Sequence, residues 1–382
     1  MTASLIPGAS LRITAPGRVN LLGEHVDYND GAVLPAAIDR AATIEAGARP
    51  DRRVQITALD LNETVIFDLD HLEQKQDFSG QPLPGWALYP AGVAWALQQH
   101  GLETRGFSAA FTSNVPMGAG LSSSAAVEVG FAALFQKLAG WAGDPMLLAR
   151  LSQVAENRYV GVNCGLMDQF ASAHGVAGHA LYFDTRSLEW QPVPLPEGSA
   201  IVIADSGVRR SLTTSAYNDR RAACEEAVRL LQPHLPGMRA LRDVTPADFN
   251  RLAHVLPPVV EKRARHVVEE CARVDEAILR LRAGDAAGFG RLMLAGHASL
   301  RDLYEVSIPE LDILVELASQ LPGCWGARLS GAGFGGCTVN LVKDSAADAF
   351  IEALKAGYQQ ATGRQAEIYL CHASRGVWVE EI

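Results

Sequence analysis

The sequence predicts an α+β protein built from two halves that share one cleft, and three observations support this. The chain has 382 residues, of which 48% are hydrophobic, enough to bury a large core. Short strand-like runs dominate the first third, and helical patterns dominate much of the remainder. Strands and helices do not alternate strictly, as they would in a parallel βαβ sheet. We expect an N-terminal half at residues 1–183 and a C-terminal half at 184–382.

The first half begins with strands and continues with helices. From Ser122 onward, apolar residues recur at three- and four-residue steps, which predicts a helix that reaches Leu138. Asp144 followed by Pro145 is a typical helix start and predicts a second helix that ends near Val160. The predicted strands are rich in β-branched residues and are separated by Pro, Gly and Asp; they cover residues 11–14, 41–47, 54–59, 64–69 and 106–112.

The second half mixes strands with longer helices. A Pro-rich segment at 232–258 loses its periodicity, and we expect it to be a linker. The predicted helices cover 214–231, 261–282 and 309–320, and the predicted strands cover 180–183, 200–204, 327–330, 338–342 and 368–371.

Composition excludes several classes of protein. Lys and Arg total 33 and Asp and Glu total 43, so the net charge is 33 − 43 = −10, and no basic stripe points to nucleic acid. Six cysteines without a CxxC pair are typical of a reducing compartment. No stretch is apolar enough over about 20 residues to span a membrane, and no signal peptide is visible. We expect a cytoplasmic protein with neither a nucleic-acid nor a membrane partner.

A loop rich in glycine and serine carries the strongest local signal. It follows a predicted strand and precedes a predicted helix, where glycines let the backbone approach a ligand and the helix N-terminus favours phosphate. An ordinary loop with a serine N-cap is the alternative. The loop lacks the lysine of a Walker A motif. It comprises Gly118, Ala119, Gly120, Leu121, Ser122, Ser123 and Ser124.

Three further motifs stand out. Residues 17–31 combine one Arg, one His, two Asn and three acids with glycines, which suits a polyhydroxylated ligand because carboxylates accept two hydroxyls at once. Within them, residues 29–31 read Asn-Asp-Gly, a turn. Residues 329–337 contain four glycines, which implies backbone packed against something large. Asp168 lies among small and apolar residues, where a structural carboxylate is commoner than a catalytic base.

Together these motifs resemble one family, the galactokinases among the GHMP small-molecule kinases. Residues 118–124 resemble the second GHMP signature, residues 330–337 the third, and residues 18–31 the galactokinase signature. The resemblance implies a two-lobed GHMP kinase fold with mixed and antiparallel sheets and an active site in the cleft between the lobes. It also implies transfer of the γ-phosphoryl group of ATP to the 1-hydroxyl of α-D-galactose. We expect a monomer.

The resemblance also assigns roles to individual positions. Asp168 matches the catalytic carboxylate, and Arg18 its cationic partner. Trp86 and Tyr89 match aromatic residues beside adenine, and the loop at 118–124 matches the nucleotide phosphate site. Ser124 and Glu156 match the ligands of Mg²⁺. The positions that match the sugar site are Glu24, His25, Val26, Asp27, Gly165 and Tyr217.

Four departures from the family pattern leave sugar selectivity open. They are Val26 in place of Thr, Ala32 in place of an aromatic residue, Asn163 in place of Pro, and Asp205-Ser206-Gly207 in place of an Asn-Ser-Asn-like run. One alternative is therefore a GHMP kinase for a related sugar, such as N-acetylgalactosamine or arabinose. Another is a galactose and ATP sensor without catalysis, although the intact Arg18 and Asp168 argue against it.

Overall fold

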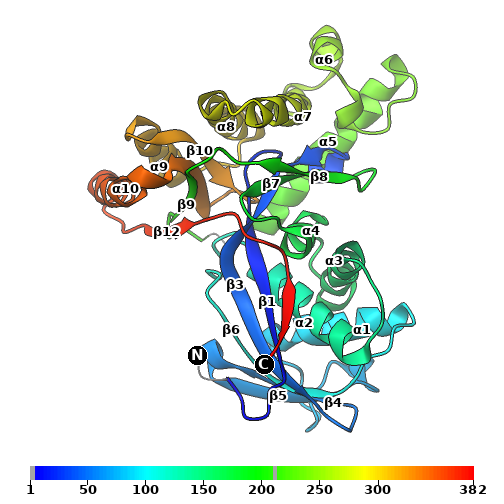
Figure 1. Ribbon diagram of the computed structural model, residues 1–382. Helices are drawn as coiled ribbons and strands as arrows, with labels where there is room; N and C mark the ends of the chain where they lie inside the picture. Colours follow the sequence, from blue (N-terminus) through cyan, green and yellow to red (C-terminus); the bar gives the residue numbers. More distant parts are fainter. Residues whose placement is uncertain (1–4, 210–212) are drawn as a thin grey trace.

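The first sheet is mixed and forms the lower part of the molecule (Figure 1). The computed structural model describes residues 5–209 and 213–382. In this sheet every neighbouring pair is antiparallel except β4 and β6, which are parallel. In spatial order its strands are β13 (Trp378–Glu381), β1 (Leu11–Asn20), β3 (Pro35–Ala48), β6 (Phe107–Ser113), β4 (Arg53–Ala58) and β5 (Glu63–Asp68).

Two antiparallel sheets complete the strand framework. The four-stranded sheet has the order β10 (Cys324–Ser330), β11 (Cys337–Lys343), β9 (Ser199–Asp205) and β12 (Glu367–Cys371). The three-stranded sheet has the order β2 (Ala32–Val33), β7 (His179–Asp184) and β8 (Trp190–Pro194). The β7–β8 hairpin spans residue 183, and β13 returns from the C-terminus to β1, so the division at residue 183 stays a prediction.

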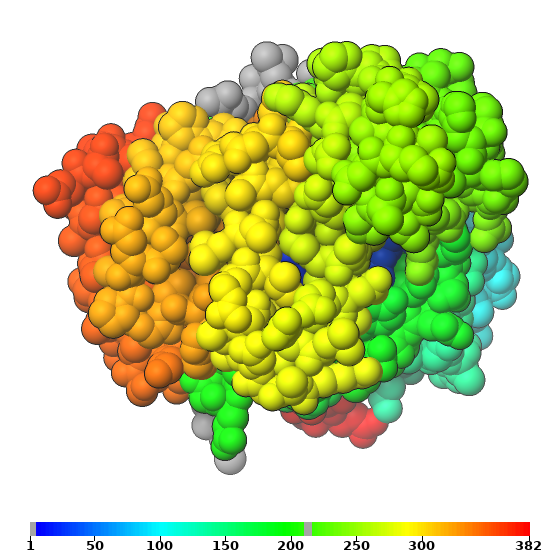
Figure 2. Space-filling view, turned by 90° about the horizontal axis from the view of Figure 1, so that it is seen from above, coloured from blue at the N-terminus to red at the C-terminus, as the bar shows by residue number. Residues whose placement is uncertain are grey.

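Helices cover the sheets on several sides (Figure 1). Beside β1 and β3 lie α1 (Leu88–Gln99), α2 (Ser123–Ala139), α3 (Pro145–Val154) and α4 (Met167–His174). Figure 2, viewed from above, shows α7 and α8 largely covering the blue N-terminal segment. The remaining helices are α5 (Thr213–Leu231), α6 (Pro246–Leu252), α7 (Pro258–Arg282), α8 (Ala286–Ser299), α9 (Pro309–Gln320) and α10 (Ala347–Thr362). No helix in the described parts of the chain is long and apolar enough to cross a membrane.

The second half of β1 brings the signature segment into the interior. In the first half of β1, buried and half-buried residues alternate from Leu11 to Thr14, so only one face of the strand is covered. From Ala15 to Asn20 every residue is buried, and the pairing with β3 shifts between Pro16 and Arg18. β1 therefore starts in one core cluster, which includes Ile13, and the chain leaves the sheet at Asn20 inside a second cluster, which includes Val19 and Leu21.

One expectation about the elements was wrong. The segment 232–258 is not a linker, because it folds into α6 and short 3-10 turns whose Leu241, Phe249 and Leu252 are buried. Such elements are too short to produce a periodic pattern. The helix expected to end near Val160 is confirmed in extent, and its last part, η5 (Ala155–Val160), is a π-helix.

Candidate active site

A cavity of about 490 Å³ opens where β1 ends, and residues from both halves of the chain line it. Gly23 (φ 92°) and His25 (φ 63°) adopt left-handed conformations that turn the chain after β1. The turn, α4 and α5 converge on the cavity. Predicted site residues in its lining are Arg18, Glu24, His25, Asp27, Gly165, Asp168 and Tyr217.

Asp168 lies in the first turn of α4, and two groups hold its carboxylate. Arg18 donates from Nε to Oδ1 at 2.8 Å, and its Nη2 lies 2.7 Å from the same oxygen. Ser122 donates from Oγ to Oδ2 at 2.5 Å. The Arg18 side chain is 6% exposed and that of Asp168 27% exposed, so the pair is anchored from the interior and faces the cavity. A carboxylate held in this way has remaining lone pairs for a substrate proton.

Asp27 approaches the backbone at Gly165. A Cβ atom at position 165 would lie 2.2 Å from Asp27 Oδ2, so only glycine at this position leaves room for the Asp27 carboxylate. Burial raises the pKa of Asp27 to about 6, and the nearby Asp168 charge adds to this. The turn at 29–31 is held by other groups, since the Val26 carbonyl accepts from the N–H groups of Asn29 and Gly31.

Glu24 is buried, and the protein contacts both of its carboxylate oxygens. The Gly331 N–H donates to Oε1 at 2.6 Å, and the Asn20 amide donates to Oε2. Arg328 Nη2 lies 3.6 Å from Oε2. Burial nevertheless raises the pKa of Glu24 to about 7, because these partners do not fully replace water.

His25 is held as a neutral ring of defined tautomer. Its Nε2 lies 3.2 Å from the Ala332 carbonyl oxygen, which can only accept, so Nε2 carries the proton. Its Nδ1 therefore accepts from the Tyr28 hydroxyl at 2.9 Å. Burial lowers the pKa of His25 to about 3, which keeps the ring neutral. The Tyr28 hydroxyl also lies 2.6 Å from that of Tyr304, a residue that sequence reasoning missed.

Val26 is a predicted site residue whose side chain the structure does not bring to the cavity. It is fully buried in a hydrophobic cluster that includes Val33 and Phe170. Valine fits this apolar position because it leaves no hydroxyl to satisfy.

The loop at 118–124 lies between this cavity and a second one. Gly118, Gly120 and Ser122 have left-handed φ values of 70°, 78° and 58°. Ser122 precedes α2 but makes no capping hydrogen bond, because its hydroxyl goes to Asp168. The alternative of an ordinary serine N-cap is therefore wrong. The first-turn N–H groups of α2 lack a side-chain cap, which suits an anion. Buried Ala119 and Leu121 fix the loop to the core.

The glycines at 331–336 pack against this loop and against two other segments, as expected. A Cβ atom on Gly331 would lie 3.8 Å from the Gly120 carbonyl oxygen. On Gly333 it would lie 2.4 Å from the Val306 carbonyl oxygen, and on Gly335 it would lie 2.5 Å from that of Val208.

The second cavity, of about 720 Å³, begins on the other side of the loop. Trp86, Tyr89 and Phe111 line it, together with Ser123 and Ser124 of the loop. Aromatic surface beside loop serines and a helix N-terminus matches the two parts of a nucleotide, base and phosphates.

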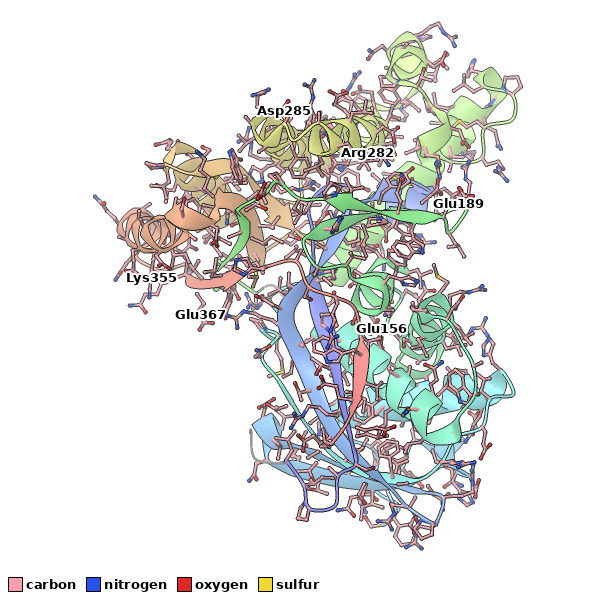
Figure 3. All side chains as sticks on the ribbon, in the orientation of Figure 1. Glu156, Glu189, Arg282, Asp285, Lys355 and Glu367 are labelled. Carbon is pink, nitrogen blue, oxygen red and sulfur yellow. The ribbon has the colours of Figure 1, made fainter. Side chains whose placement is uncertain are left out.

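Glu156 and Ser124 form an oxygen pair suited to a cation. Ser124 Oγ lies 3.3 Å from Glu156 Oε1, and η5 carries Glu156 into the interior (Figure 3). Burial raises the pKa of Glu156, with a further contribution from Asp168. None of the ion pairs within the described residues involves Glu156. Mg²⁺ commonly takes one or two protein oxygens together with phosphate oxygens, so these residues fit it.

Two buried residues behind Glu156 were missed by sequence reasoning. Gln169 Nε2 lies 2.6 Å from Glu156 Oε2 and 3.0 Å from Glu128 Oε2, so one amide group joins both carboxylates. Burial raises the pKa of Glu128 well above its ordinary value. The sequence does contain a signal for Glu128. It lies one helical turn after Ser124, so an acidic residue falls on the buried face of the predicted helix.

Comparisons with known proteins identify the family of the chain. Three family models match: the galactokinase galactose-binding signature at residues 7–48, the GHMP kinases N-terminal domain at 89–176, and the GHMP kinases C-terminal domain at 276–360. A galactokinase from Roseiflexus sp. is 49% identical over 365 residues, covering 96% of this chain and 92% of that protein. A galactokinase from Chloroflexus aggregans is 48% identical over 365 residues, covering 95% and 92%.

Solved structures confirm the expected α+β GHMP kinase fold. The crystal structure of Lactococcus lactis galactokinase complexed with galactose superposes with a TM-score of 0.89 at 35% identity, covering 96% of this chain and 95% of that one. Methanococcus jannaschii mevalonate kinase superposes with a TM-score of 0.69 at 18% identity, covering 97% and 100%, which shows the shared fold alone. The galactokinases from Roseiflexus and Chloroflexus match almost the whole chain at close to 50% identity. The chain therefore belongs to the galactokinase family of GHMP kinases.

Proposed function

We propose that this protein transfers the γ-phosphoryl group of ATP to the 1-hydroxyl of α-D-galactose, giving α-D-galactose 1-phosphate and ADP. One observation carries the proposal: Asp168, held by Arg18 and Ser122, faces the cavity that the sugar-signature residues line. Ser123 and Ser124, from the same loop as Ser122, line the neighbouring cavity. Sugar and nucleotide would thus meet on opposite sides of one loop.

In this proposal Asp168 accepts the proton of the attacking 1-hydroxyl. Arg18 orients the carboxylate through two contacts and offers positive charge beside the transferring group. Phosphoryl transfer depends mainly on positioning and on neutralising charge, and the uncapped N–H groups at the start of α2 serve both needs.

Sugar recognition would rest on the other residues of the 490 Å³ cavity. Asp27 and Glu24 accept hydroxyls, and Tyr217 closes one side of the cavity. His25 has both ring nitrogens engaged by the protein, so it would shape the cavity with its ring face and edge. A site whose buried groups need sugar hydroxyls rejects an epimer that misplaces one.

On the nucleotide side, Trp86 and Tyr89 would contact adenine, and the loop at 118–124 would hold the phosphates. Ser124 and Glu156 would hold Mg²⁺, which neutralises phosphate charge when bound. We also propose a cytoplasmic monomer with neither nucleic-acid nor membrane partners, since all six cysteines are free thiols and the net charge is −10.

A coupled assay of ADP release across galactose, glucose, N-acetylgalactosamine and arabinose tests this function. Phosphorus NMR of the product identifies the phosphorylated hydroxyl. We expect turnover with galactose above all others and a phosphate on the 1-hydroxyl. Faster turnover with N-acetylgalactosamine or arabinose would favour a kinase for that sugar. Galactose binding without ADP release would favour a sensor.

A further inference from the structure

Arg40 on β3 is the only Lys or Arg among the described residues that line the 720 Å³ cavity. Its Nη1 lies 3.4 Å from the Asn114 carbonyl oxygen, just before the glycine–serine loop. Its Cζ lies 4.6 Å from the ring centroid of Tyr369 on β12, so the guanidinium stacks on an aromatic face. These contacts hold the side chain in the cavity wall without neutralising it.

The charge of Arg40 has no acidic partner at contact distance. No ion pair within residues 5–209 and 213–382 includes Arg40, and its buried Nε lacks a hydrogen-bond acceptor. The neighbouring Asp39 carboxylate lies 3.4 Å from Nδ1 of His372. The nearby Cys371 thiol stays neutral, because burial raises its pKa to about 12.

The remaining acid in the cavity lining is also engaged elsewhere. Asp60 accepts from Thr112 Oγ1 at 2.7 Å and from the Ser113 N–H at 2.7 Å. These contacts anchor it to β6, so its carboxylate is not directed to Arg40. An arginine left unpaired in a cavity is a donor for a planar or tetrahedral oxyanion.

The cavity divides chemically into an apolar part and a polar part. Trp86, Leu61 and Phe111 contribute apolar surface that suits a base, whereas Ser123 and Ser124 contribute hydroxyls. Arg40 and Asn114 belong to this polar part, which also borders the start of α2, where no side chain caps the N–H groups. A polyphosphate entering a protein of net charge −10 needs local positive charge in addition to these dipoles.

We propose that Arg40 binds the phosphate groups of the nucleotide, as a nucleotide-binding residue outside the glycine–serine loop. The inference rests on the proposed function only in taking this cavity to hold ATP. Arg40 would donate from its guanidinium to phosphate oxygens while Tyr369 supports its flat face. Its effect would fall on nucleotide affinity and leave galactose affinity unchanged, since it does not line the sugar cavity.

Calorimetric titration of the full-length protein with ADP at fixed Mg²⁺, without galactose, tests the proposal. The variants are Arg40→Met, which keeps length but removes charge, and Arg40→Lys, which keeps charge. Arg53→Met is the matched control, because Arg53 on β4 also stacks on an aromatic ring, with Cζ 3.9 Å from the Phe78 centroid, but lies outside both cavities. Melting temperatures confirm that each variant is folded.

We expect Arg40→Met to weaken ADP binding about tenfold, Arg40→Lys to recover part of the loss, and Arg53→Met to have no effect. Raising KCl from about 50 to about 300 mM should weaken ADP binding less in Arg40→Met than in the wild type, since one screened contact is gone. Unchanged ADP affinity in Arg40→Met would overturn the proposal. Equal losses in the Met and Lys variants with unchanged salt dependence would also overturn it.

The two proposals fail separately in these experiments. A wild-type protein that binds ADP in an Arg40-dependent way but does not phosphorylate galactose refutes the proposed function and leaves the inference standing. Galactose phosphorylation with ADP affinity indifferent to Arg40 refutes the inference alone.

Discussion

Replacing Gly165 with alanine tests how the Asp27 carboxylate reaches the sugar cavity. The new Cβ would lie 2.2 Å from Asp27 Oδ2 and 3.2 Å from its Cγ. Ordinary contacts between non-bonded heavy atoms lie near 3.5 Å, so the carboxylate must move by roughly 1 Å. It borders the cavity and can rotate into the open space, but it then loses its alignment with the sugar hydroxyls.

The expected cost follows from that displacement. A hydrogen bond to a charged group contributes about 1.5–3 kcal/mol, so the galactose KM should rise roughly ten- to hundredfold. The ATP KM should change little. The φ of Gly165 lies outside the left-handed region, so alanine fits the backbone and reduces the entropy of the unfolded chain. The melting temperature of Gly165→Ala should therefore equal that of the wild type.

Steady-state kinetics with both substrates and a double-mutant cycle with Asp27→Ala separate this mechanism from general damage. Asp27→Ala alone should raise the galactose KM and weaken discrimination against glucose. In that background Gly165→Ala should add nothing, because the displaced group is gone. Gly357→Ala on α10, far along the chain, is the control. An unchanged galactose KM in Gly165→Ala, or strictly additive effects in the double variant, would refute the reasoning.

Four further outcomes follow from the structure. Glu156→Gln should raise the Mg²⁺ concentration for half-maximal activity about tenfold, measured by metal titration, with galactose affinity unchanged. Ser122→Ala removes the 2.5 Å contact to Asp168, and kcat should fall about tenfold with smaller changes in either KM. The free-enzyme pKa values of about 7 for Glu24 and about 6 for Asp27 predict that kcat/KM for galactose falls as pH drops through this range. Both values exceed those of the unfolded chain, so the folded state binds more protons, and urea-unfolding stability should decrease as pH rises from about 4 to about 7.

Much of the site was predictable because its residues cluster in short motifs. The glycines and serines at 118–124 predict a loop before a helix. In the structure Ser123 and Ser124 of that loop line one cavity, and Ser122 contacts Asp168, which lines the other. Runs of β-branched residues predict the strands. The end of β1 was not predictable: the strand extends six residues beyond Thr14, and from Ala15 onward both of its faces are buried, which removes the alternating pattern. The motifs thus predicted which residues line the two cavities better than they predicted where the strands end.

Other features left no periodic or compositional signal. The helix α1 is apolar on most sides, so it lacks the stripe that marks an amphipathic helix. The helix α8 contains Gly288, Gly290 and Gly296, which suggest a loop. In the structure Gly290 lets α8 pack on β10, since a Cβ there would lie 1.7 Å from the Trp325 carbonyl oxygen. Tyr304 supports the Tyr28 hydroxyl from 276 residues away, a contact that only tertiary structure creates.

The galactose affinity and turnover of Asp168→Asn test the central claim most directly. Asparagine keeps the shape and most of the polarity of the side chain but loses the acceptor for the hydroxyl proton. We predict that kcat falls by about 10²–10⁴, while the galactose Kd measured by calorimetry stays within about threefold of the wild type. Turnover close to that of the wild type in Asp168→Asn would contradict the account.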